Sequence, residues 1–128
     1  MNVGLNKFRD TGYADLNFAE NDALSIHDKI QNKFGLGDGS YCLTDKEATR
    51  EKIIGCVRKI AEMAKPEDTV FISLSTHGDF LYNTENKPDF YLITTDSLAH
   101  DLATSSLPMD VLKSELSNIK AERKIIFL

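Results

Sequence analysis

One histidine follows directly on a strand-like apolar run and could serve as a general base. The segment Thr69–Asp79, TVFISLSTHGD, has five apolar or small residues and then a turn that presents His77 and Gly78. Histidine is the usual general base because its unperturbed pKa lies near neutrality. Gly78 has no side chain, so its backbone N–H could approach a developing oxyanion closely. On spacing alone, a single histidine at a strand end is more often structural, and Gly78 is equally a turn glycine.

The sequence offers few other reactive groups. It has no serine in a nucleophile-elbow pattern, no glycine-rich phosphate loop and no metal-spaced pair of histidines. Cys42 and Cys56 fall in an expected strand and an expected helix, and we interpret them as buried residues of a reducing compartment. We therefore expect a cytoplasmic protein. His27 and His100 are expected to be solvated.

Length and charge limit the classes of partner. The 128 residues fit a single domain, residues 1–128, and 41% of them are hydrophobic. No apolar run approaches the roughly 20 residues of a membrane helix, so no membrane partner is expected. The net charge is -5 and the 15 Lys and Arg are scattered, which argues against nucleic acid. A peptide or protein partner fits better.

Apolar residues at spacings of three and four predict a first helix over residues 17–34. Asn17 and Glu20 resemble a capping box at its start, and Gly35 suits its end. A second helical stripe runs from Ile53 until Pro66 ends it, with either Thr44 or Thr49 as its N-cap.

Strand-like segments alternate with these helices. Short strands are expected over residues 40–43 and 90–94, and a strand buried on both faces is expected over 70–75. Residues 78–89 are polar and predict an irregular segment. Pro108 fits the first turn of a third helix, which leads to a strand over residues 124–128.

The alternation predicts an α/β fold with a mostly parallel sheet and helices on both faces. Ligands bind such sheets beyond the carboxyl ends of the strands, where His77 lies. Only Val3 and Leu5 are apolar at the N-terminus, and the last apolar run stops at Leu128. We therefore expect a domain that is truncated at both ends.

Five segments resemble, in order, the blocks of the caspase-like cysteine peptidases (peptidase C14, clan CD), most closely the bacterial caspase-like and metacaspase branch. They are LNFAENDAL, LTDKEATREKI, KPEDTVFISLSTHGD, YLITTD and SSLPMDVLKSEL, spread over nearly the whole chain. The resemblance implies a caspase-like three-layer sandwich and the histidine-bearing large-subunit portion of a cysteine endopeptidase.

The same resemblance assigns roles to the turn after the buried strand. His77 and Gly78 match the catalytic histidine and the oxyanion glycine of a Ser-Gly-His-Gly turn, in which Thr76 replaces the first glycine. The family's nucleophilic cysteine follows the histidine by about 50 residues, which is where this chain stops. Cys42 and Cys56 do not match that position. The fragment alone is therefore expected to be inactive and to need the missing C-terminal part of the catalytic domain.

Substrate preference also follows from the resemblance. Leu16 stands where the aspartate-specific branch has an arginine, so an acidic residue before the scissile bond (P1) is not expected. Asp22 and Ser75 match residues that line the metacaspase pocket for a basic P1 residue. Asp22 is equally well explained as a surface or capping carboxylate.

Calcium is the one metal that the resemblance suggests. Metacaspases can bind it through acidic residues that follow the histidine, and Asp79, Glu85, Asp89 and Asp96 are available here. Scattered acids are normally only solvated, so no cofactor is expected, and Asp96 is better explained as a residue that caps or orders its loop.

Two other functions remain open from the sequence. Thr76 and the absent nucleophile are equally consistent with a pseudopeptidase that uses the fold as a protein-binding or regulatory module. An unrelated α/β ligand-binding domain of the receiver or flavodoxin type fits the alternation but does not account for the five segments.

Overall fold

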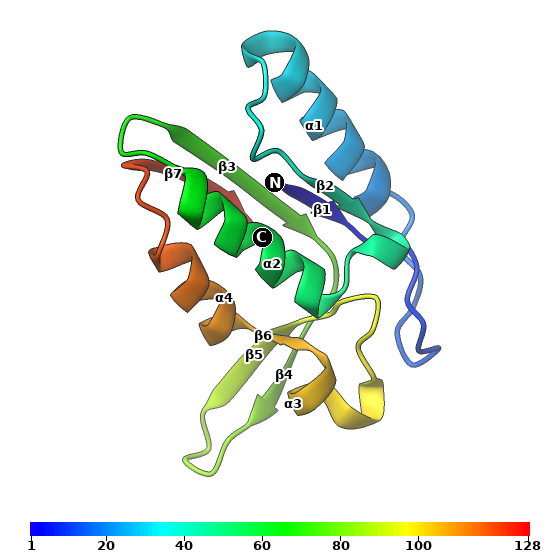
Figure 1. Cartoon of the computed structure of the whole chain (residues 1–128). Coiled ribbons are helices and arrows are strands. Elements are labelled where there is room, and N and C mark those ends of the chain that lie inside the picture. The colour runs from blue at the N-terminus through cyan, green and yellow to red at the C-terminus, as the bar shows by residue number, and fades with distance from the viewer.

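A parallel four-stranded sheet forms the centre of the molecule. The computed structural model describes residues 1–128. The strands lie in the order β2-β1-β3-β7, and every neighbouring pair is parallel (Figure 1). Their bounds are β1 Asn2–Gly4, β2 Cys42–Thr44, β3 Thr69–Ser75 and β7 Arg123–Phe127. The expected α/β fold with a mostly parallel sheet is confirmed.

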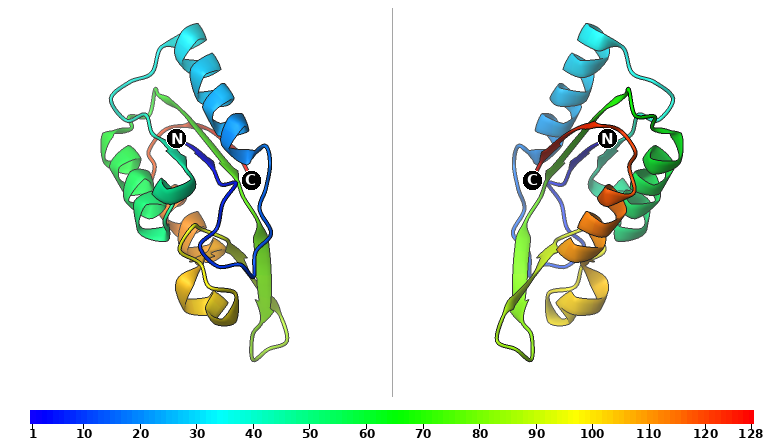
Figure 2. Two further views of the ribbon diagram at one scale, coloured as in Figure 1. Left: turned by 90° about the vertical axis from the view of Figure 1, so that its right-hand side faces the viewer. Right: turned by 90° about the vertical axis from the view of Figure 1, so that its left-hand side faces the viewer.

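Helices lie on both faces of this sheet (Figure 2). Helix α1 (Ala19–Phe34) packs over β1, β2 and β3 on one face. Helices α2 (Arg50–Met63) and α4 (Met109–Ser117) contact each other on the opposite face. No helix is both long enough and apolar enough to cross a membrane.

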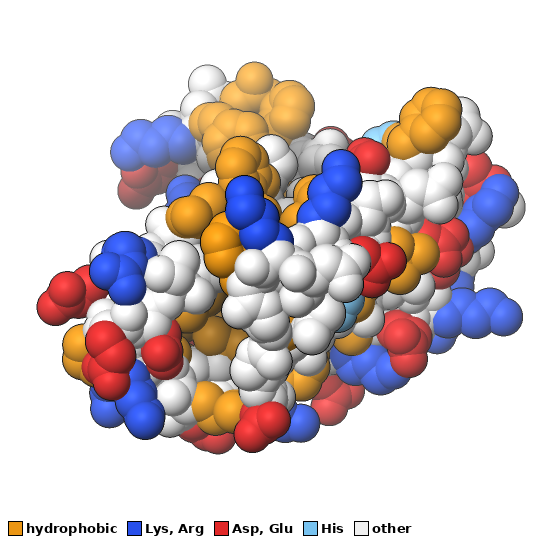
Figure 3. All heavy atoms as spheres, turned by 90° about the horizontal axis from the view of Figure 1, so that it is seen from above, with side chains coloured by type: hydrophobic (Ala, Val, Ile, Leu, Met, Phe, Trp, Pro, Cys, Tyr) orange, Lys and Arg blue, Asp and Glu red, His pale blue; other side chains and the backbone are white.

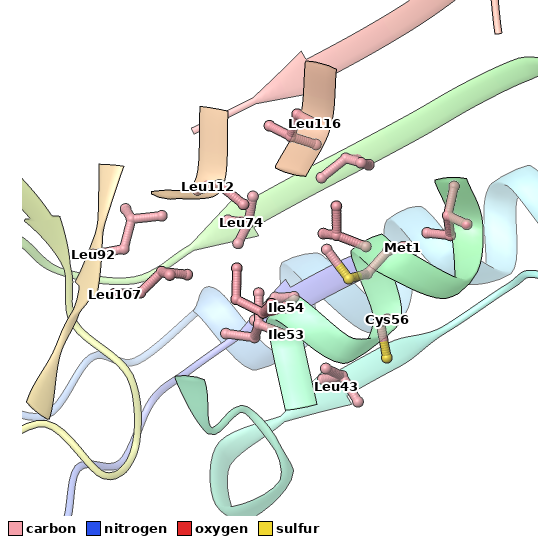
Figure 4. Packing of buried hydrophobic residues seen from close by; sticks show 14 of the residues in the cluster. Met1, Leu43, Ile53, Ile54, Cys56, Leu74, Leu92, Leu107, Leu112 and Leu116 are labelled. Atoms are coloured by element: carbon pink, nitrogen blue, oxygen red, sulfur yellow. The ribbon is translucent and has the colours of Figure 1, made fainter. Parts of the chain in front are cut away.

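The main core fills the space between the sheet and the pair α2 and α4 (Figure 4). Alternate residues of β3 point into it, because successive side chains of a strand lie on opposite faces. The buried residues of this cluster include Val3, Leu5, Ile53, Val57, Ile72, Leu74, Leu112 and Leu116. The apolar side chains on one face of β3 and those at helical spacing in α2 and α4 therefore form one continuous core.

The face beneath α1 is built from smaller and more polar side chains. Ser73 donates its hydroxyl hydrogen to Asn2 Oδ1 over 2.8 Å, and both residues are buried. A Cβ atom at Gly4 would lie 2.1 Å from the carbonyl oxygen of Ala19 and 2.8 Å from the Cβ atom of Ala23. Helix α1 therefore rests directly on the backbone of β1.

A second, antiparallel sheet follows His77, and it corrects the prediction that residues 78–89 are irregular. It contains β4 (Gly78–Tyr82), β5 (Pro88–Leu92) and β6 (Leu107–Pro108), in that order. Its hairpin projects from the body of the molecule in Figure 1.

Turn chemistry and aromatic pairing account for this hairpin. The Asn83 side-chain oxygen accepts the N–H groups of Glu85 and Lys87, both at 3.0 Å, and Asn86 has a φ of 58°. The turn is therefore confined to residues 83–87, and the residues on either side of it pair as strands. Phe80 lies opposite Phe90 across the two strands, with ring centroids 6.2 Å apart, a pair that favours a ladder.

The boundaries of α1 follow the prediction at one end only. Gly35 ends the helix with a φ of 69°, as expected. The predicted capping box is wrong, because Phe18 occupies the N-cap and no side chain of its own caps the helix. The Glu20 N–H instead donates to Asn6 Oδ1, 3.2 Å away, so the cap comes from a distant loop.

Helix α2 has a double cap. Thr49 is its N-cap and accepts the N–H of Lys52 over 3.2 Å, which decides between the two predicted threonines. Asp96 Oδ1 also accepts the N–H of Arg50 over 3.1 Å and the hydroxyl hydrogen of Thr94 over 2.7 Å. The prediction that Asp96 caps or orders its loop is confirmed.

The remaining elements are short. They are the 3-10 helices η1 (Asp45–Glu47) and η2 (Ala99–Asp101) and the single-turn helix α3 (Leu102–Ser105). Pro108 lies in β6 and at the N-cap of α4, rather than in the first turn of a helix. The strand predicted over residues 40–43 begins at Cys42.

Candidate active site

His77 lies at the carboxyl edge of the parallel sheet, in the turn between β3 and β4. Two hydrogen bonds fix this turn to Ile93, a fully buried residue. The Ile93 N–H donates to the carbonyl oxygen of His77 over 2.9 Å, and the Thr76 hydroxyl donates to the carbonyl oxygen of Ile93 over 2.7 Å. The side chain that distinguishes Thr76 from a glycine therefore stabilises the turn.

Replacing Thr76 by valine should lower the free energy of unfolding by about 1 kcal/mol, because the nearly isosteric side chain cannot donate to Ile93. Urea unfolding monitored by circular dichroism measures this change. Thr84→Val, at an exposed position of the hairpin turn, is the matched control and should change the free energy of unfolding by less than about 0.5 kcal/mol. Equal effects of the two substitutions would show that the Thr76 hydroxyl contributes nothing specific.

The imidazole of His77 is oriented by a loop from the N-terminal part of the chain. Its Nε2 atom lies 2.7 Å from the carbonyl oxygen of Ala14. A carbonyl oxygen can only accept, so Nε2 carries the hydrogen, and in the neutral imidazole Nδ1 keeps its lone pair. The Phe8 ring packs against the imidazole with centroids 5.2 Å apart and an interplanar angle of 32°. Nδ1 is therefore the nitrogen that could accept a proton.

The loop that carries Ala14, residues 6–18, is closed at its base and fastened to the body. The Leu16 N–H donates to the carbonyl oxygen of Asn6 over 2.9 Å, which brings the two ends together as in an Ω-loop. Asp45 Oδ1 accepts the N–H groups of Asn6 and Lys7 at 2.8 and 3.1 Å. The loop is thus held by backbone hydrogen bonds as well as by its packing.

The backbone N–H of Gly78 points away from the hairpin partner. In an antiparallel ladder the hydrogen-bonded pairs alternate, and here they include His77 with Ile93 and Asn83 with Lys87. The N–H of Gly78 consequently faces the free edge of β4. A Cβ atom at Gly78 would meet only the Tyr91 carbonyl oxygen at 3.8 Å, so the space beside the Gly78 Cα atom is open.

The two residues predicted to line a substrate pocket lie on different elements. Ser75 is the last residue of β3, half-buried, and its carbonyl oxygen accepts the Leu5 N–H over 3.0 Å. Asp22 is exposed in the first turn of α1. No hydrogen bond joins them, and two surface hollows, one beside the end of α1 and one beside Gly78, contain none of Asp22, Ser75 and His77. Their role in substrate binding stays a prediction.

Neither cysteine of the chain can act with His77. Cys56 is buried in the core on α2 and belongs to the main apolar cluster, and Cys42 starts β2. Burial raises the pKa of both thiols, which disfavours the thiolate. Neither thiol is therefore activated to react beside His77.

The acidic residues after His77 are engaged locally. Asp79 Oδ1 accepts the N–H of Phe80 over 2.8 Å, Asp89 accepts from Asn83, and Glu85 pairs with Lys87. No group of three or more His, Cys, Asp or Glu side chains lies close enough together to hold a metal ion.

Sequence reasoning missed Ala14 and Phe8, the two residues that orient His77. Ala14 contributes only its backbone carbonyl, which has no signature in the sequence, and Phe8 resembled any apolar residue. The expectation that His27 is solvated was also wrong, because this residue is half-buried. Its Nδ1 atom lies 3.4 Å from Asn2 Nδ2. His100 is exposed as expected.

Comparison with known proteins gives a match among the solved structures but none to a protein family. No protein-family model and no curated protein matches the chain. Among solved structures, it is similar to the crystal structure of protein GSU0716 from Geobacter sulfurreducens, with 27% sequence identity and a TM-score of 0.76. The match covers 97% of this chain and 46% of that one. The chain therefore shares its fold with rather less than half of a longer protein.

Proposed function

We propose that this chain is the histidine-bearing part of a caspase-like cysteine endopeptidase with a three-layer sandwich fold. The observation that carries the proposal is the state of His77: it lies at the carboxyl edge of the sheet and its Nε2–H donates to the Ala14 carbonyl. That bond leaves Nδ1 as the base. The five sequence segments that resemble the family are a second, separate support for the proposal.

The proposed reaction needs a cysteine thiol supplied from beyond Leu128. Nδ1 of His77 accepts the thiol proton while sulfur bonds to the substrate carbonyl carbon, and the N–H of Gly78 donates to the resulting oxyanion. The imidazolium then gives its proton to the leaving amine as the C–N bond breaks. Water hydrolyses the thioester and restores the thiol. Residues 1–128 alone are expected to be inactive.

The proposed substrates carry arginine or lysine at P1. Leu16 offers no cation for an acidic side chain, and the exposed carboxylate of Asp22 is available to pair with a basic one. Leu16 belongs to the loop that orients His77, and its backbone is fixed there by its hydrogen bond to Asn6.

We also propose that the C-terminal part of the catalytic domain packs against β7. This strand pairs only with β3, and the side chains of Ile125, Phe127 and Leu128 are 44%, 59% and 63% exposed. Figure 3 shows that hydrophobic side chains lie at the surface on the face seen from above, among charged ones. An edge strand that is apolar on both faces favours pairing with a further strand.

The decisive experiment is to express the chain with all residues that its reading frame encodes beyond Leu128. We expect a following cysteine and cleavage of peptides with Arg or Lys at P1, blocked by iodoacetamide. A reading frame that ends at Leu128, or a non-nucleophilic residue at the cysteine position, would contradict the peptidase proposal.

The second candidate is a pseudopeptidase that serves as a protein-binding or regulatory module. It is favoured by Thr76, whose hydroxyl bond to Ile93 stabilises the turn whether or not the site is active. Partner binding that is unaffected by His77→Ala, together with no cleavage by the extended protein, would support this function.

A further inference from the structure

The orientation of His77 depends on where the loop over residues 6–18 places one carbonyl oxygen. This loop is not part of any helix or strand, yet Ala14 near its end contacts Nε2 at 2.7 Å. A carbonyl that moved by an ångström would no longer select one tautomer of the imidazole. Something must therefore fix the far part of the loop as well as its base.

Asp10, in the far part of this loop, bonds two separate segments of backbone. Its Oδ1 atom accepts the N–H of Gly12 over 2.8 Å, and its Oδ2 atom accepts the N–H of Ala99 over 2.7 Å. The N–H groups of Gly12 and Ala99 hold the pKa of Asp10 below its usual range. Charge-assisted hydrogen bonds of this kind are about twice as strong as neutral ones.

The fit between the two segments is close at the same point. A Cβ atom at Gly12 would lie 2.7 Å from the Cβ atom of Ala99 and 3.2 Å from Asp10 Oδ1. Nearby, the Arg9 N–H donates to the carbonyl oxygen of Thr95 over 3.2 Å. The loop is thus docked onto residues 95–99, which belong to the segment that also caps α2 through Asp96.

We infer that Asp10 is a positioning residue for His77. By joining Gly12 to Ala99 it sets the place of the Ala14 carbonyl, which in turn holds the hydrogen on Nε2. A contribution of Asp10 to catalysis rests on the proposed peptidase function, but its effect on the tautomer of His77 does not.

The test reads the tautomer of His77 in the 128-residue chain by 15N NMR, at a pH where the imidazole is neutral. In the unaltered protein we expect well-separated shifts for a protonated Nε2 and an unprotonated Nδ1. Asp10→Asn replaces two acceptor oxygens by one, so only one of the two N–H groups keeps its partner. The two shifts are then expected to converge as both tautomers become populated.

Two further variants make the result specific. Asp15→Asn removes the same charge from the same loop, but Asp15 pairs only with the Lys7 side chain, so the shifts should stay separated. Gly12→Ala keeps the Asp10 carboxylate and forces the loop away from Ala99, so the shifts should converge. Amide spectra outside residues 6–18 and 95–101 confirm that each variant is folded.

Unchanged separation in Asp10→Asn would overturn the inference, and so would equal convergence in Asp15→Asn. If the extended protein fails to cleave peptides, the inference that Asp10 sets the tautomer of His77 is unaffected. The two proposals can therefore fail independently.

Discussion

Replacing His77 by alanine is expected to lower peptide cleavage by the extended protein by about 10²- to 10⁴-fold or more. The imidazole belongs to the residue that directly precedes Gly78, and Ala14 and Phe8 already hold it in one orientation. The loss should appear in kcat, because proton transfer takes place in the transition state and not in substrate binding.

His100→Ala is the matched control for that measurement. His100 is exposed in η2 and forms no hydrogen bond with the turn that carries His77, so cleavage should be unchanged. Retained cleavage in His77→Ala would mean that another group is the base. A folded state like that of the unaltered chain, checked by circular dichroism, excludes unfolding as the cause of a loss.

Replacing Gly4 by alanine is expected to have the largest effect on stability, a loss of about 3 kcal/mol or more. The added methyl group would lie 2.1 Å from the Ala19 carbonyl oxygen, which is backbone and cannot rotate away. Helix α1 would have to move off β1, and the buried bond between Ser73 and Asn2 lies beneath the same helix. Urea unfolding measures the change in free energy.

Gly55→Ala is the control for this prediction, because it adds the same methyl group in a different setting. Gly55 lies within α2, and a Cβ atom there has no neighbour within 4 Å. Alanine has the higher helix propensity, so this variant should gain about 0.5–1 kcal/mol. A loss at Gly4 no larger than the usual effect of a surface substitution would show that α1 tolerates displacement from the sheet.

The fold could be predicted where local chemistry and tertiary packing agree. Apolar side chains at helical spacing gave both long helices, because the same side chains fill the core. Gly35 ends α1 because the backbone there has a positive φ. Thr49 begins α2 through an ordinary hydrogen bond to the N–H of Lys52. Each of these signals depends on neighbours within a few residues.

Predictions failed where the partner of a residue is distant in the sequence. The side chain that accepts a free N–H at the start of α1 is Asn6 rather than Asn17, and Asn6 is brought there by the docking of a loop. The hairpin of β4 and β5 looked irregular because polar residues at its turn outweighed the Phe80 and Phe90 pair.

The candidate site likewise combines residues that the sequence predicts with one that it does not. His77 and Gly78 were visible in the sequence because side-chain chemistry and a strand end mark them. The Ala14 carbonyl that decides the tautomer was not, since every residue has a carbonyl and only the path of residues 6–18 brings this one to Nε2.

The position of β1 sets a requirement on the timing of synthesis. This strand is made before β2 and β3, yet it lies between them, and its Asn2 bonds Ser73 across 71 positions of the chain. At about 5–20 residues per second, roughly 4–14 s pass between the synthesis of β1 and that of β3. During that interval Val3 and Leu5 have no completed core to enter. The central position of β1 can therefore be completed only after β3 has been made.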